Sequence, residues 1–152
     1  MTDDGERRPA GPLHLLKMAV GIGDLDDLRR VRAERIEQLG GSFVFTRNRP
    51  HRAEAVLCGG SLYWVIRGQI RARQRLIGFR SERDEKGRGY CLIEVAPELV
   101  PTVWRPWRPF QGWRYLSPAD APPDRTAGME EDPEGMPMPA RMAAELRALG
   151  LL

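Results

Sequence analysis

The sequence contains few residues of the types that form metal centres, disulfides or catalytic pairs. It has two cysteines, Cys58 and Cys91, and two histidines, His14 and His51. The cysteines are far apart and form no CxxC pair, so we expect buried, reduced thiols and neither a metal site nor a cofactor. No pair of carboxylates stands out for acid–base catalysis. The sequence therefore leaves open whether the protein is an enzyme.

Long apolar segments are also missing. No run approaches the roughly 20 residues that a membrane-spanning helix needs. The opening residues, MTDDGERRPAGP, lack the apolar core of a signal peptide. We therefore expect a cytoplasmic protein that does not enter a membrane.

Lysine is nearly absent, because all the basic residues except Lys17 and Lys86 are arginines. Residues 41–116 hold 14 basic and 6 acidic side chains, whereas residues 117–152 hold 3 basic and 7 acidic ones. A basic body with an acidic tail favours an anionic partner. Codon bias also produces arginine-rich sequences, and the sequence alone does not separate the two explanations.

The most informative stretch runs from Ser61 to Phe79. It begins with the apolar run LYWVI, which predicts a strand buried on both faces. After Arg67-Gly68 the residues alternate, as they do in a strand with two different faces. One face carries Ile70, Ala72, Gln74 and Leu76, and the other carries Arg71, Arg73 and Arg75.

Hydrophobic periodicity, caps and turn residues predict the other elements. The chain is expected to form a single α+β domain over residues 13–117, with five or six strands in a small curved mixed sheet or a barrel, and two packed helices. Strands are predicted at 13–20, 42–46, 61–66, 69–79 and 90–95, helices at 25–39 and 50–57, and a loop at 80–89. Residues 1–12 are expected to be a disordered lead-in, 118–139 a linker rich in proline and acidic residues, and 140–152 a short helix.

The first candidate site is the segment TRNRPHR at residues 46–52. It places a hydroxyl, an amide and arginines where a strand gives way to a helix, and such groups suit a phosphate or carboxylate. The alternative is a turn with solvated arginines. The candidate residues here are Thr46, Arg47, Asn48 and Arg52.

The second candidate site is the arginine face, which comprises Arg67, Arg71, Arg73 and Arg75. Arginines that point the same way repel one another unless acidic groups or a ligand lie between them. Glu94, the acidic tail or a polyanion could supply that charge. Gln74, on the opposite face, either ties the backbone together or lines a pocket.

The third candidate site is the segment WRPWRPFQGWRY at residues 104–115. Unpaired bases could stack on its rings while guanidinium groups bind phosphates. The alternative is that the rings close the core and the arginines stack on them. The candidate residues are Trp107, Arg108, Gln111, Trp113 and Arg114, together with Trp64 from the central stretch.

Several segments resemble a known family. LHLLKMAVG, the run from Thr46 to Glu54, GGSLYWVIRGQIRARQRLIGF and RPFQGWRYLSPADAPPD are similar to an uncharacterised, mostly alphaproteobacterial group, domain-of-unknown-function family 1489. The similarity spans roughly residues 13–124, so the tail from Arg125 onward is expected to be peculiar to this chain. The order of elements also resembles the PUA-like superfamily with its ASCH and EVE domains. That resemblance implies a small barrel whose cleft binds RNA or a modified base.

Three functions are consistent with these patterns. The first is a binding module for RNA or a modified nucleotide, which uses the arginines for phosphates and the tryptophans for stacking. The second is a small-molecule, hydrolase-like enzyme with residues 46–52 as its anion clamp. The third is a protein-interaction adaptor whose acidic tail masks its basic face. The oligomeric state is open.

Overall fold

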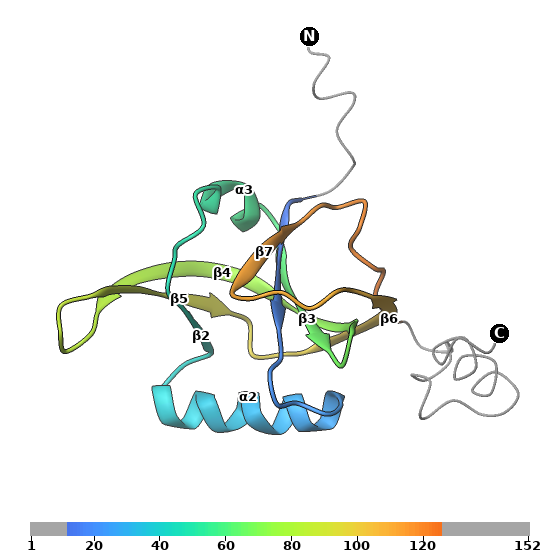
Figure 1. The fold of residues 1–152 in the computed structure, drawn as a ribbon, viewed down its shortest axis with the longest axis horizontal. Helices are drawn as coiled ribbons and strands as arrows, with labels where there is room; N and C mark the ends of the chain where they lie inside the picture. The colour runs from blue at the N-terminus through green and yellow to red at the C-terminus, as the bar shows by residue number, and fades with distance from the viewer. Residues whose placement is uncertain (1–11, 126–152) are drawn as a thin grey trace, which may run out of the picture.

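A strongly curved mixed sheet forms the body of the protein in the computed structural model, which describes residues 12–125 (Figure 1). The small α+β fold is confirmed, with seven strands instead of five or six. The elements are β1 (His14–Met18), α2 (Leu25–Leu39), β2 (Phe43–Thr46), α3 (Ala53–Leu57), β3 (Ser61–Ile66), β4 (Gln69–Arg83), β5 (Gly89–Val95), β6 (Val100–Pro106) and β7 (Trp113–Leu116).

The sheet is open rather than a closed barrel. Its order is β2-β5-β4-β3-β1-β7, with β6 pairing on β4. Strands β1 and β3 are parallel, and the other pairs are antiparallel. No backbone pairing joins the outer strands β2 and β7 in the part of the chain that the structure describes. Side chains of β7 instead hold the segment after β2: the indole Nε1 of Trp113 donates to the Asn48 carbonyl at 3.0 Å, and the Arg52 amide donates to the Tyr115 hydroxyl at 2.8 Å.

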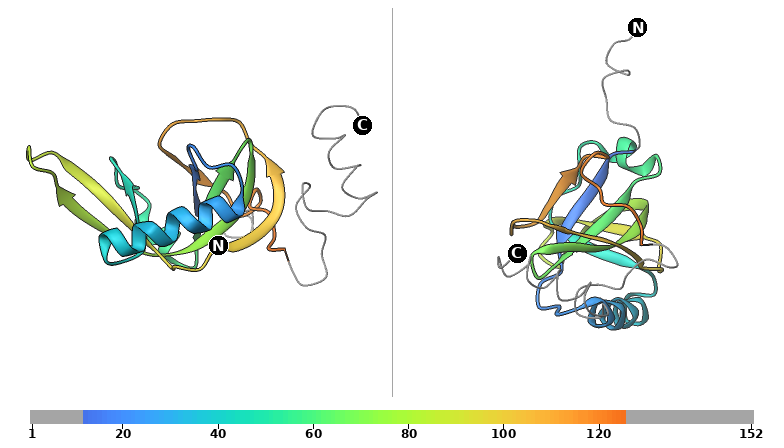
Figure 2. Two further views of the ribbon diagram at one scale, coloured as in Figure 1. Left: turned by 90° about the horizontal axis from the view of Figure 1, so that it is seen from below. Right: turned by 90° about the vertical axis from the view of Figure 1, so that its right-hand side faces the viewer.

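Strand β4 is the longest element of the sheet and is shared by two groups of strands. Its first half pairs with β3 on one edge and β6 on the other, and after a shift between Leu76 and Gly78 it pairs with β5. The strand continues to Arg83, so the loop predicted at 80–89 is wrong in its first residues. The β4–β5 hairpin extends past the rest of the sheet (Figures 1 and 2). Its far end therefore has solvent on both faces.

Helix α2 begins and ends where the sequence predicts. The side chain of Asp24 accepts a hydrogen bond from the Asp27 amide, and Gly40 has a left-handed φ of 74° and donates to the Ile36 carbonyl. These are N-cap and C-cap geometries. The helix lies along one side of the sheet (Figure 1) and buries Leu25, Leu28 and Arg32.

The turn between β3 and β4 consists of Arg67 and Gly68, whose φ angles are 50° and 81°. A two-residue hairpin with positive φ at both positions is a type I′ turn, which favours asparagine followed by glycine. We expect Arg67→Asn to raise the free energy of unfolding by about 0.5–1 kcal/mol, because arginine is strained at positive φ and asparagine tolerates this conformation better. Urea unfolding would measure this change. Arg75→Asn, in the exposed part of β4 where φ is negative, should be neutral or destabilising.

The chain stays on the sheet beyond residue 117, where we expected the linker to begin. Thr102 and Asp124 form a β-bridge, and backbone hydrogen bonds join Val103 to Pro123 and Pro101 to Arg125. This pairing uses the outer edge of β6, so residues 118–125 belong to the folded body. The predicted lead-in, the rest of the linker and the terminal helix lie outside the described residues. None of the helices described here is long and apolar enough to cross a membrane.

Candidate functional site

The predicted arginine face of β4 is not a continuous exposed surface. Arg71 is buried, and its guanidinium lies 3.6 Å from the centre of the Trp104 ring. Arg73 makes two hydrogen bonds to Asp124, at 2.7 and 2.8 Å, and Arg75 is exposed. The expectation of one basic face is wrong because β4 shifts register between Ile70 and Ala72, which interrupts the alternation at Arg71, and because Trp104 and Asp124 contact Arg71 and Arg73.

Gln74 and Trp64 are parts of the packed core. Gln74 is fully buried, accepts a hydrogen bond from Trp64 Nε1 at 3.0 Å and donates to the Ala96 carbonyl at 2.8 Å. Both members of the pair thus have their polar atoms satisfied inside the protein. Of the two readings of Gln74, the structure shows the structural tie. Trp64 has no exposed ring face for a base.

A second set of buried polar contacts involves His14. Its Nδ1 accepts a hydrogen bond from the Ser61 amide at 3.0 Å, and its ring meets Tyr63 edge-on at 4.9 Å. Burial, assisted by the nearby charge of Arg73, lowers the pKa of His14 from 6.5 to about 4. The histidine is therefore neutral in the folded protein at neutral pH.

This shift predicts a loss of stability in acid. In the unfolded chain His14 is protonated near pH 6.5, whereas in the folded protein it is protonated only near pH 4. The contribution of the neutral, buried His14 to the free energy of unfolding is therefore complete above pH 6.5 and is lost as the pH falls from 6.5 to 4. The contribution is on the order of 2–3 kcal/mol. Urea unfolding at a series of pH values should show this decline in the wild type. His14→Asn should show a flatter dependence, and an equally steep one would contradict the assignment.

The aromatic segment at 104–115 closes the core, as the alternative reading proposed. Trp107 and Phe110 pack against the buried cluster around Leu16 and Ile70. Trp113 packs against the larger cluster. The guanidinium groups of this segment cover its rings at 5.8 Å for Arg105 on Trp107 and 5.3 Å for Arg114 on Phe110. The remaining candidates of this segment, Arg108 and Gln111, are exposed.

The segment 46–52 lies between the β4–β5 hairpin and β7. Thr46 is buried opposite Cys91, Arg47 and Asn48 are exposed, and Arg52 is exposed beyond them. Arg67, the last of the predicted site residues, stands at the β3–β4 turn. The structure thus brings the 46–52 segment to Trp113, and the arginine of β4 that lines a hollow with it is Arg83, which the sequence had not singled out.

Two hollows flank the end of the hairpin, and both are lined by Arg47, Arg83 and Tyr90. The first, which we name the arginine pocket, has a volume of about 450 Å³. It is lined by Arg47, Asn48, Arg49, Ser81, Glu82, Arg83, Gly89, Tyr90 and Cys91. Three arginines and one acidic residue are thus among the residues that line this hollow.

The second hollow, which we name the aromatic groove, has a volume of about 730 Å³. It is lined by Arg35, Leu39, Phe45, Arg47, Arg83, Asp84, Glu85, Lys86, Arg88, Tyr90 and Leu92. The rings of Phe45 and Tyr90 lie 5.1 Å apart with 33° between their planes, and the Arg47 guanidinium lies 5.3 Å from the Phe45 ring. Half of the Phe45 surface is exposed. The groove therefore combines an accessible aromatic face with cations.

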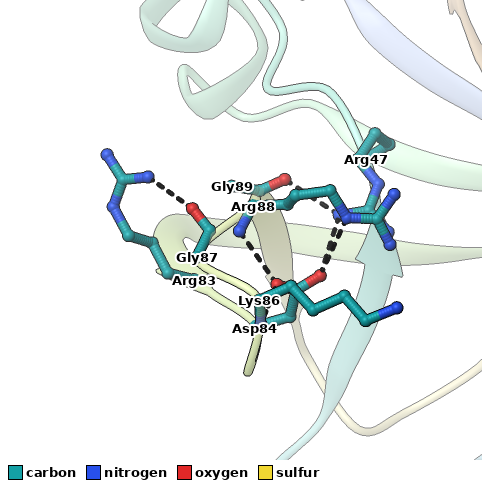
Figure 3. A network of polar contacts seen from close by, with 7 residues as sticks. All are labelled: Arg47, Arg83, Asp84, Lys86, Gly87, Arg88 and Gly89. Carbon is teal, nitrogen blue, oxygen red and sulfur yellow. Dashed lines mark hydrogen bonds and ion pairs between the residues drawn. The ribbon is translucent and has the colours of Figure 1, made fainter.

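The tip of the hairpin holds some of these cations in place. Asp84 accepts hydrogen bonds from the amides of Lys86 and Arg88, and its carboxylate lies 3.8 Å from Arg47 (Figure 3). These hydrogen bonds, the backbone N–H of Arg88 first, lower the pKa of Asp84. The carboxylate of Asp84 thus already has its partners within the turn and at Arg47.

Phe45, Tyr90, Arg83, Arg49 and Arg35 were not among the predicted site residues. A usable signal was present, because FVFT and YCLIEV are apolar at successive positions. When an outer strand carries apolar residues on both faces, only one face packs against the core, and the apolar residues of the other face are exposed. Phe45 pairs with Leu92 on that outer face, and Thr46 pairs with Cys91 on the other.

The two cysteines are free, and Cys91 is buried, as expected. Cys58 is exposed, so the expectation that it would be buried is wrong. It follows α3 at its C-terminal end, where the helix leaves the core. Among residues 12–125, no three side chains of histidine, cysteine, aspartate or glutamate gather as metal ligands do.

Comparisons with known proteins identify one family. A family model described as protein of unknown function, DUF1489, matches residues 15–152. The match includes the tail, so the expectation that the tail is peculiar to this chain is wrong. Neither the curated proteins nor the solved structures contain a significant match.

Proposed function

We propose from the geometry that this chain, which belongs to the DUF1489 family of proteins of unknown function, is a module that binds single-stranded RNA. Family membership by itself indicates no activity. The aromatic groove is the binding surface in this proposal. The PUA-like order of elements supports it as an analogy. We further propose a cytoplasmic location, where the exposed Cys58 stays reduced.

The observation that carries the proposal is the half-exposed ring of Phe45 beside Tyr90 and Arg47. An unpaired base of any identity can stack on an exposed aromatic ring. A strand of RNA also brings one negative charge for each nucleotide. Arg47 can therefore bind a phosphate next to a base that lies on the Phe45 ring.

The charges around the groove favour a polyanion. Five basic side chains line it, against two acidic ones. One of these acids, Asp84, is already bonded within the turn. The basic side chains come from α2, from the end of β2 and from the hairpin, so they surround the aromatic rings. These basic side chains are Arg35, Arg47, Arg83, Lys86 and Arg88.

Binding fits the two hollows better than catalysis. Neither is lined by a histidine. Ser81 and Glu82 both line the arginine pocket, but they are successive residues of β4, so their side chains point to opposite faces of the sheet. A serine and a carboxylate on opposite faces cannot act as nucleophile and base.

We expect a single-stranded RNA oligomer to bind at low salt, with an affinity that falls as salt rises. Phe45→Ala should weaken binding by about 10- to 100-fold through lost stacking. Arg47→Gln should weaken it by about tenfold and reduce the slope of log K against log salt by ~0.7. Fluorescence anisotropy with a labelled oligomer would measure both.

Arg75→Gln is the matched control, because Arg75 is an exposed arginine of β4 that lines neither hollow. Its affinity and salt slope should stay close to those of the wild type. The proposal fails if the wild type binds no RNA at low salt, or if the two groove variants bind as well as the Arg75 variant. DNA of the same sequence tests whether the 2′-hydroxyl contributes.

A further inference from the structure

We propose that the arginine pocket binds the terminal phosphate monoester of a strand whose bases lie in the aromatic groove. This inference rests on the proposed function for its source of ligand and adds a site and a ligand class to it. The pocket opens on the other face of the same strands. Its ligand is a phosphate dianion.

The guanidinium groups of the pocket are fixed by the protein itself. Arg47 donates to the Gly89 carbonyl at 3.0 Å, and Arg83 donates to the Gly87 carbonyl at 2.8 Å (Figure 3). The Arg49 guanidinium lies 5.6 Å from the centre of the Phe79 ring. A guanidinium has five N–H donors, so these contacts orient the groups and use only part of their capacity. Groups held in place before binding lose little entropy on binding.

The polar atoms beside the arginines suit a phosphate. Ser81 pairs with Cys91 across the hairpin, so its hydroxyl is on the same face as the buried thiol. Asn48 adds an amide, and its own carbonyl is held by Trp113. Glu82 is the single acid that lines the pocket, and alternation directs it away from Ser81. Hydroxyl and guanidinium donors around a small cavity form charge-assisted bonds with phosphate oxygens.

The connection with the groove determines which phosphate is bound. Arg47, Arg83 and Tyr90 line both hollows, so the two hollows are adjacent. An internal phosphodiester has one negative charge. A terminal monoester carries close to two charges at neutral pH and therefore gains more from several arginines. Three arginines in a pocket of about 450 Å³ match the second case.

The test compares three RNA tetramers of one sequence, with a 5′-phosphate, a 3′-phosphate or hydroxyls at both ends, on the full-length protein. We expect one phosphorylated oligomer to bind at least about tenfold more tightly than the hydroxyl form, as two or more charge-assisted bonds allow. Which oligomer does so gives the polarity of the strand. Arg49→Gln should remove the difference and leave the affinity for the hydroxyl form within twofold of the wild type.

Arg35→Gln is the matched control, because Arg35 lines only the aromatic groove and Arg49 only the arginine pocket. This variant should weaken the binding of all three oligomers equally and preserve the ratio of their affinities. Arg49→Lys keeps the positive charge but loses the planar guanidinium with its paired N–H donors. It should therefore keep part of the affinity ratio between the phosphorylated and the hydroxyl oligomers. Circular dichroism and the melting temperature show whether each variant is folded. Equal binding of the three oligomers by the wild type, or an unchanged ratio in Arg49→Gln, overturns the inference.

Titration with inorganic phosphate separates this inference from the proposed function. In the wild type it should shift the amide resonances of Ser81 and Cys91, and in Arg49→Gln it should not. If no oligomer binds and these shifts appear, the RNA-binding proposal fails and the phosphate site stands. If oligomers bind and neither the shifts nor the end preference appears, the phosphate site fails and the RNA-binding proposal stands.

Discussion

Replacing Gly60 with alanine is expected to destabilise the protein by at least about 3 kcal/mol, a large share of the 5–15 kcal/mol that stabilises a typical domain. An added Cβ at this position would overlap the carbonyl oxygens of Leu13 and Val56. Both are backbone atoms at the points where β1 begins and α3 ends, so no side-chain rotation relieves the overlap. The variant would show this in urea unfolding, or in a low yield of folded protein.

The backbone of Gly60 is also fixed from two directions. Its amide donates to the Val56 carbonyl at 2.9 Å, and its own carbonyl accepts from the Leu76 amide at 3.0 Å. Gly23→Ala is the matched control, because nothing lies within 4 Å of a Cβ there and the backbone has ordinary φ. It should change stability by less than about 1 kcal/mol. Similar stabilities for the two variants would contradict the close packing at Gly60.

The second large effect is expected for Gln74→Leu. The substitution is close in size but removes the hydrogen bonds of the side chain, and it leaves Trp64 Nε1 and the Ala96 carbonyl without their partner. Each buried polar group left unsatisfied costs about 1–3 kcal/mol, so we expect a loss of about 4 kcal/mol. Chemical unfolding monitored by tryptophan fluorescence would measure it.

A double-mutant cycle tests the cause of that loss. Trp64→Phe removes the indole donor, so the double variant with Gln74→Leu should lose less than the sum of the two single variants, by about 1 kcal/mol or more. Additive losses would show that Gln74 stabilises the core by its volume alone. The same variants should keep RNA affinity, since neither residue lines the two hollows.

The parts of the fold that local chemistry specifies could be predicted from the sequence. Asp24 and Gly40 delimit α2 because a cap acts on its own helix, and Gly68 marks the turn between β3 and β4 because glycine accepts positive φ without strain. Strand β6 was not predicted as a separate strand, because Pro101 and Pro106 argue against a strand in general. Prolines are tolerated on an outer strand, and β6 pairs only with β4 among the described strands.

The missed strand explains the errors at the site. Alternation predicts that Arg71 and Arg73 share a face of β4, but it does not show that the strand shifts register between Ile70 and Ala72, which pack in different buried clusters. It also does not show that Trp104 and Asp124 contact these two arginines, from segments some 30 to 50 positions away. The hydrogen bond from Trp113 to Asn48 likewise joins distant positions. Segment 46–52 could be singled out from the sequence because its polar groups are concentrated within seven residues, and Arg47 and Asn48 of this segment line the arginine pocket.

The position of β1 has a consequence for synthesis of the chain. Strand β1 pairs with β3 on one side and with β7 on the other, so that His14 stands opposite Leu116. A nascent chain that has not yet reached residue 113 therefore exposes one whole edge of β1, whose sequence is HLLKM. Such exposed edges pair with strands of other chains. The last of the described strands to leave the ribosome thus protects the first of them. We expect truncated translation products of this protein to aggregate or to require chaperones.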